Sequence, residues 1–137
     1  LVEVLNKGKS TATTEVTGEA RIEASSLTSI DKPKALQAVM GDDELYNDLL
    51  NDFLELEDEL NALKQAIDNR DFPSIARNAH IFTTALRYIG AYTLAELASS
   101  IELTIKRNEH KTADKLSNQL EVLYNALLEL REKVKKR

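Results

Sequence analysis

The chain has 137 residues, 42% of them hydrophobic, and a mean hydropathy of -0.35, which suffices for the core of one modest domain. A net charge of -5 argues against a general nucleic-acid binder, because phosphate contacts need concentrated Lys and Arg. The lack of Cys excludes disulfides and thiolate metal sites. No apolar run approaches the roughly 20 residues of a membrane span, so we expect no membrane contact by this domain and a cytoplasmic location.

Residues 1–29 are rich in Lys, Ser, Thr, Gly and Glu and show little hydrophobic periodicity. We interpret them as a mostly flexible linker that follows an upstream domain of a longer protein. The ordered domain is expected to cover residues 30–137. Its first element is a short helix that Asp31 caps, with Pro33 in the first turn and Gly41 just after the end.

A long helix is predicted from Asp42 or Asp43 to about Asn69, because an almost uninterrupted apolar stripe runs through this segment. The stripe consists of Leu45, Leu49, Phe53, Leu56, Leu60, Leu63 and Ile67. The other faces carry many carboxylates, which we interpret as a solvated surface rather than a site.

The next helix is expected to start near Asp71 and Pro73 and to end at Gly90, since glycine tolerates the positive φ that closes many helices. Its apolar stripe consists of Ile75, Ala79, Phe82, Leu86 and Ile89. His80 lies one residue, about 100° of rotation, off this stripe. The imidazole is therefore expected at the edge of the buried face. That position suits a reacting or docking histidine, but on periodicity alone an ordinary boundary residue is the better explanation.

Two more helices follow. Thr93 and Glu96 have the spacing of a capping box for the first of them, which continues to about Arg107. The second runs from about Thr112 to Lys136. Its apolar stripe consists of Leu116, Leu120, Leu123, Leu127, Leu130 and Val134. Together the elements predict an all-α fold, an up-down antiparallel four-helix bundle with a short N-terminal helix.

Few residues of this chain fit a metal site or a hydrolytic triad, and no cofactor is expected. His110 falls in a predicted turn without the Glu-x-x-His spacing of bundle metal sites. What remains is His80, with Arg77 and Arg87 about one and two helical turns away on a similar face. A neutral imidazole is a good nucleophile and its ring nitrogen can hold a phosphoryl group, whose charge the guanidiniums would offset.

The segment ARNAHIFTTALRYIGAYTLAELASSIE resembles the signature of histidine-containing phosphotransfer (HPt) domains of multistep two-component phosphorelays. The agreement runs from about residue 30 to the C-terminus and includes the Ala-His pair and the Gly-Ala pair at Gly90 and Ala91. The resemblance implies that His80 accepts a phosphoryl group from a receiver-domain aspartate and passes it to another receiver. It further implies a carrier without kinase activity of its own, with Mg²⁺ on the partner receiver only.

The chain departs from the family pattern just after the histidine. Family members usually carry Lys three residues after it and Gly four residues after it, where this chain has Thr83 and Thr84. The resemblance makes Arg77, Thr83, Thr84 and Arg87 the expected contacts to the phosphoryl group or receiver, and Gly90 a structural turn. The alternative is a degenerate, non-catalytic bundle that docks a receiver or another partner.

The implied partners are response-regulator receiver domains, with this domain monomeric. The implied parent protein is a hybrid sensor histidine kinase, whose anchor would lie in the inner membrane.

Overall fold

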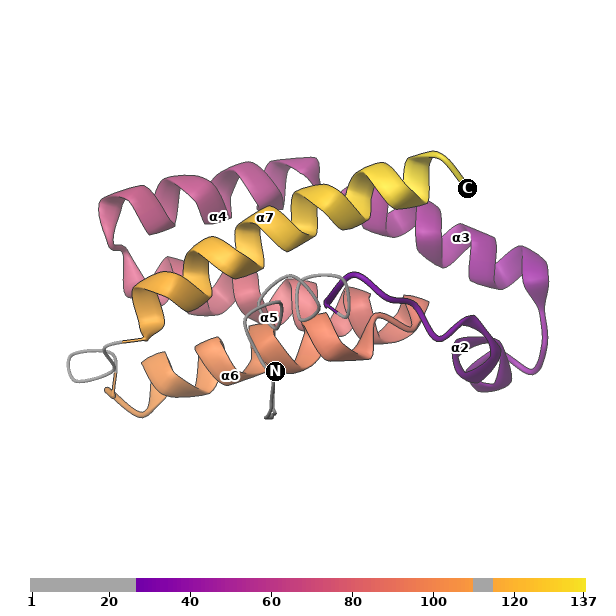
Figure 1. Ribbon diagram of the computed structural model, residues 1–137, viewed down its shortest axis with the longest axis horizontal. Helices are drawn as coiled ribbons and strands as arrows, with labels where there is room; N and C mark the ends of the chain where they lie inside the picture. Colours follow the sequence, from indigo (N-terminus) through magenta and orange to yellow (C-terminus); the bar gives the residue numbers. More distant parts are fainter. Residues whose placement is uncertain (1–26, 110–114) are drawn as a thin grey trace, which may run out of the picture.

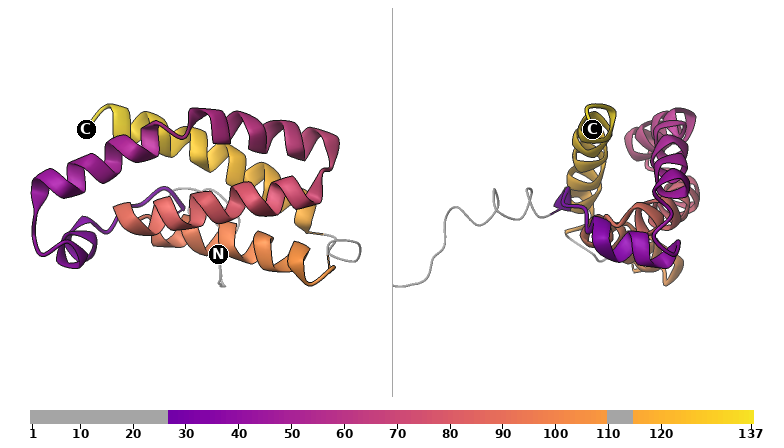
Figure 2. Two further views of the ribbon diagram at one scale, coloured as in Figure 1. Left: turned by 180° about the vertical axis from the view of Figure 1, so that it is seen from behind. Right: turned by 90° about the vertical axis from the view of Figure 1, so that its right-hand side faces the viewer.

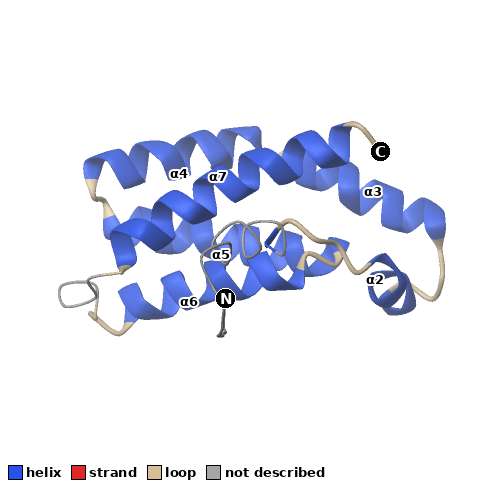
Figure 3. Ribbon diagram, in the orientation of Figure 1, coloured by secondary structure: helices blue, strands red, loops and turns tan. Residues whose placement is uncertain are grey.

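The computed structural model describes residues 27–109 and 115–137, and every regular element in these ranges is a helix (Figures 1 and 3). In chain order the helices are α2 (Lys32–Ala38), α3 (Asp43–Leu54), α4 (Glu57–Asn69), α5 (Phe72–Ile89), α6 (Tyr92–Lys106) and α7 (Leu116–Lys135). The predicted all-α class is confirmed. None of these helices has the length and apolar character needed to cross a bilayer. The predicted linker lies almost wholly outside the described residues, as does His110.

The helix α5 lies at the centre of the fold. It packs against α6, α4, α3 and α2, while α7 packs against α6, α3 and α4 (Figures 1 and 2). All five predicted stripe residues of α5 are buried, and so are all six of α7. The helical period thus predicted correctly which faces of these two helices form the core.

The long helix predicted up to Asn69 is interrupted at Glu55 and Leu56. The guanidinium of Arg131, on α7, donates to the carbonyl oxygen of Leu54 at 2.9 Å. The N–H of Leu56 binds the carbonyl oxygen of Phe53, at 3.2 Å, in a tighter turn. A side chain that enters the helical hydrogen-bond ladder is a known cause of such breaks. Because this donor is 77 residues away in sequence, local periodicity could not indicate it.

The residues of α3 that face the core also differ in part from the predicted stripe. The predicted stripe began at Leu45, but this side chain is 43% exposed. The buried residues of α3 are Tyr46, Leu50 and Phe53. Tyr46 is anchored by its hydroxyl, which donates to the carbonyl oxygen of Ile89 at 2.7 Å.

Three of the predicted helix starts are confirmed at atomic detail. The carboxylates of Asp31, Asp42 and Asp71 each accept a hydrogen bond from a backbone N–H in the first turn of their helix. The capping box at Thr93 is wrong, because the N-cap position of α6 is Ala91, two residues before Thr93, and it has no side-chain cap. The turn after α5 is so short that the chain enters α6 before Thr93 is reached.

Gly90 makes this short turn, as predicted. Its φ is +91°, and its carbonyl oxygen accepts from the N–H of Asp31 at 2.9 Å. A Cβ at this position would lie 2.7 Å from the carbonyl oxygen of Asp31 and 3.1 Å from the Cβ of Ala35. Both the backbone conformation and the close approach of α2 therefore require glycine.

Candidate functional site

His80 lies on α5 at the edge of the core, as its position beside the stripe predicts. The preceding residue, Ala79, is fully buried, whereas the His80 side chain is 65% exposed. The ring is held from one side only: its Nδ1 atom lies 3.1 and 3.2 Å from the two carboxylate oxygens of Glu102, on α6.

Glu102 is a buried carboxylate, with a side chain only 8% exposed. Its Oε2 atom also lies 2.5 Å from the Nζ atom of Lys106, one helical turn further along α6. Burial raises the pKa of the Glu102 carboxyl, but the hydrogen bonds and charges of Lys106 and His80 outweigh burial and leave the pKa below its ordinary 4.5. The carboxylate is therefore ionised at neutral pH and is held between two donors.

This contact determines the tautomer of the neutral imidazole. An ionised carboxylate only accepts hydrogen bonds, so the Nδ1 atom of His80 must carry the hydrogen that points at Glu102. The Nε2 atom then keeps its lone pair, and no described residue forms a hydrogen bond with it. An oriented, exposed imidazole with a free lone pair has the arrangement of a nucleophile.

A hollow of about 540 Å³ lies between α5 and α6 beside the imidazole, and we call it the His80 hollow. It is lined by Pro73, Ala76, Arg77, His80, Ile81, Glu102, Ile105 and Lys106. The guanidinium of Arg77 donates to the hydroxyl of Ser74 at 3.3 Å, and no carboxylate among the described residues pairs with it. The His80 hollow therefore joins the imidazole, a buried carboxylate and two cationic side chains.

The other predicted contact residues lie in different surroundings. Thr84 is exposed one turn after His80, and its hydroxyl donates to the carbonyl oxygen of His80 at 3.3 Å. Thr83 is only 4% exposed, and its hydroxyl donates to the carbonyl oxygen of Ala79 at 2.8 Å. Burial of Thr83 does not fit the predicted contact with a phosphoryl group or receiver, so we withdraw it from the site.

Arg87 does not line the His80 hollow. Its guanidinium faces Glu96, on α6, with 4.0 Å between the nearest nitrogen and oxygen. The structure thus brings Arg77 and Thr84 close to His80 and places Arg87 about two turns further along α5.

A second, smaller hollow of about 230 Å³ lies on the other side of the α5 ridge, between α5 and α3. Its lining residues are Leu49, Asp52, Phe53, Leu56, Ile81, Thr84, Ala85 and Tyr88. Ile81 lines both hollows. Ile81 therefore separates the two hollows, and His80, one residue before it, lines the larger of them.

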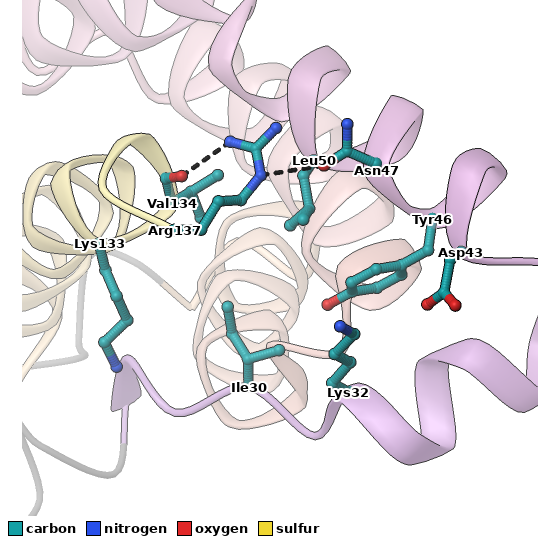
Figure 4. A pocket seen from close by; sticks show the side chains of 9 residues that line it. All are labelled: Ile30, Lys32, Asp43, Tyr46, Asn47, Leu50, Lys133, Val134 and Arg137. Atoms are coloured by element: carbon teal, nitrogen blue, oxygen red, sulfur yellow. Dashed lines mark hydrogen bonds between the residues drawn. The ribbon is translucent and has the colours of Figure 1, made fainter.

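A larger hollow, about 920 Å³, lies elsewhere, between the start of α2, α3 and the end of α7 (Figure 4). Several of its polar groups are already engaged: Arg137 donates to Asn47, Asn51 and the carbonyl oxygen of Val134, and the hydroxyl of Tyr46 donates to the carbonyl oxygen of Ile89. These bonds close one end of the fold, and we assign no chemistry to this hollow. In the two described ranges, no three His, Asp or Glu side chains converge as metal ligands do.

Sequence reasoning missed Glu102 and Lys106. The helical period does indicate that Glu102 is buried, because this residue lies four residues after Ala98 and directly after Ile101, on the apolar face of α6. A carboxylate at a core position needs buried partners. Lys106, four residues further, is the partner that helical spacing offers on the same helix.

A comparison with protein families shows where the chain belongs. The model of the Hpt domain family matches residues 48–132, from within α3 to near the end of α7. The chain therefore belongs to the Hpt domain family, as the resemblance around His80 predicted. Hpt domains are phosphocarriers of phosphorelay signalling that interact with receiver domains and have no catalytic activity of their own. No curated protein and no solved structure matched the chain.

The low pKa of Glu102 leads to an expected pH dependence of folding. The unfolded chain binds a proton at Glu102 at a higher pH than the folded chain does, so this group stabilises the fold above its ordinary pKa of 4.5. That contribution is lost as the pH falls through the lower folded pKa. Urea unfolding at several pH values is expected to show a steeper loss of stability on acidification for the wild type than for Glu102→Gln. The exposed Glu96→Gln variant should follow the wild type, and identical acid profiles for all three proteins would contradict the assignment.

Proposed function

We propose that His80 is the phosphoryl acceptor of this chain, and that it carries the group from an aspartyl phosphate of one receiver domain to an aspartate of another. The observation that carries this proposal is the hydrogen bond from Nδ1 of His80 to the buried Glu102, on a histidine side chain that is 65% exposed. An ordinary boundary histidine needs no buried carboxylate behind it. Burying Glu102 costs free energy, which its two donors offset.

The proposed step is an in-line displacement at phosphorus. The lone pair of Nε2 attacks, an N–P bond forms, and the bond from phosphorus to the receiver's aspartate oxygen breaks, so that the aspartate leaves as a carboxylate with the electron pair. The proton on Nδ1 stays in place, and Glu102 offsets the positive charge that the ring acquires. Transfer to the next receiver is the reverse reaction. Mg²⁺, which neutralises the charged phosphoryl oxygens, is expected on the receiver.

The surface around His80 supports docking of a folded partner. Exposed Tyr88 and the apolar side chains of the two hollows flank the ridge that carries the imidazole. Exposed aromatic and apolar residues are enriched in protein interfaces. Thr84, one turn after His80, is also exposed and would lie within this interface.

We also propose the up-down four-helix topology, with α3 and α4 together counting as one interrupted helix. The contacts of α5 with α4 and α6, and of α7 with α6 and α3, support it. The hybrid sensor kinase parent, the cytoplasmic location and the monomeric state stay predictions.

The test of this function is incubation of the chain with a panel of phosphorylated receiver domains. We expect phosphate to leave at least one receiver and to appear on the chain as an acid-labile, base-stable adduct. Binding of receivers without any transfer would support the degenerate docking module instead.

A further inference from the structure

A phosphoryl group on His80 would need cations that α5 provides only in part. It brings close to two negative charges at neutral pH. The position at which the family pattern has Lys is Thr83, which is buried. Arg87, the other predicted cation, faces Glu96 about two helical turns away. The compensating charge must therefore come from Arg77 and from outside α5.

Lys106 is the cationic side chain that α6 places in the His80 hollow. Its Nζ atom contacts Oε2 of Glu102, and the same carboxylate contacts the imidazole, so one residue separates the ammonium from the ring. The Lys106 side chain is 60% exposed. An ammonium has three N–H donors, and the contact with Glu102 occupies one of them.

We propose that Lys106 and Arg77, from two adjacent helices, hold the phosphoryl group on Nε2 between them. In this arrangement Lys106 supplies from α6 the charge that the family pattern places three residues after the histidine. The inference rests on the proposed function and adds to it a binding role for a residue outside the α5 signature.

The surroundings of the two cations favour this role. Their hollow has apolar walls from Pro73, Ala76 and Ile105, which reduce screening by water and strengthen the attraction between unlike charges. Arg77 has a hydroxyl as its partner and so keeps its charge available. The ammonium of Lys106 offsets Glu102 before transfer and reaches the phosphoryl oxygens with its remaining donors after it.

The experiment loads the chain with phosphoramidate, which phosphorylates histidines without a receiver, and follows the phosphoryl group by ³¹P NMR as the pH is changed. Nearby cations favour the dianion, so Lys106→Met is expected to raise the midpoint of the last phosphoryl ionisation by roughly 0.5 to 1 pH unit. Lys106→Arg should keep the midpoint near that of the wild type. The control is Lys64→Met, which removes the lysine of another i,i+4 ion pair, with Asp68 on α4, and should change nothing.

A second pair of variants separates direct contact from an effect through Glu102. Lys106→Met leaves a buried carboxylate without its cation, which by itself can disturb the fold. In a Glu102→Gln background that charge is absent, and removal of Lys106 should still raise the phosphoryl midpoint. If it does not, Lys106 acts only as the partner of Glu102 and the proposal is overturned.

The outcomes for the two proposals are distinct. Failure of every receiver to transfer phosphate would reject the proposed function, while the phosphoramidate titration would still test the role of Lys106. Equal midpoints for the wild type and Lys106→Met would reject the role of Lys106 even if transfer is observed. Failure of phosphoramidate to modify His80 would reject both, because both need an accessible Nε2.

Discussion

His80→Gln is expected to abolish phosphoryl acceptance from a phosphorylated receiver, while His110→Gln leaves it unchanged. Glutamine has no ring nitrogen with a nucleophilic lone pair, so no N–P bond can form. Its amide N–H can still donate to Glu102, and the His80 side chain is 65% exposed, so stability should change by no more than about 0.5 kcal/mol. The measurement is base-stable phosphate on the chain, together with urea unfolding to check the fold.

The chain contains two histidines, so His110 is the natural control for chemical specificity. Acceptance that survives His80→Gln and disappears in His110→Gln would place the acceptor in the segment after α6. Acceptance that survives both substitutions would exclude a histidine acceptor altogether. Either result would reject the role that we give to Glu102 and to the His80 hollow.

Gly90→Ala is expected to destabilise the fold by about 2 to 4 kcal/mol. Part of the loss comes from a positive φ of 91°, which a residue with a Cβ adopts only with strain. The larger part comes from the new Cβ, which would lie 2.7 Å from the backbone oxygen of Asp31 and would push α2 away from the turn. Urea unfolding of both proteins measures the difference.

Gly41→Ala is the matched control, because Gly41 also has a positive φ, of 75°, but no atom lies within 4 Å of the Cβ position. It is expected to cost only the backbone strain, about 1 kcal/mol. Equal losses for the two variants would show that α2 does not pack closely on the turn between α5 and α6.

The sequence predicted those features that depend on helical period. The buried stripes of α5 and α7 follow directly from the spacing of their apolar residues, and His80 lies at the boundary because it is one residue off its stripe. The same helical period also indicates that Thr83 is buried, because it lies four residues after Ala79 and three before Leu86. The prediction that Thr83 belongs to the site followed from the family pattern and not from this spacing.

The features that were not predicted depend on contacts between distant parts of the chain. The break between α3 and α4 coincides with a hydrogen bond from Arg131, and local sequence carries no sign of that partner. The pair of His80 and Glu102 joins two helices, so its geometry needs the packing of α5 on α6. Periodicity can mark a carboxylate on an apolar face, but only the fold identifies the histidine that it binds.

The most direct test of the account is to locate the phosphoryl group on the imidazole ring. Long-range ¹H–¹⁵N correlation spectra of the ¹⁵N-labelled, phosphorylated chain distinguish the two ring nitrogens, and unmodified His110 serves as an internal reference. We predict phosphorylation of His80 at Nε2, with Nδ1 still protonated and bound to Glu102. Phosphorylation at Nδ1, or at His110 with His80 unmodified, would contradict the account.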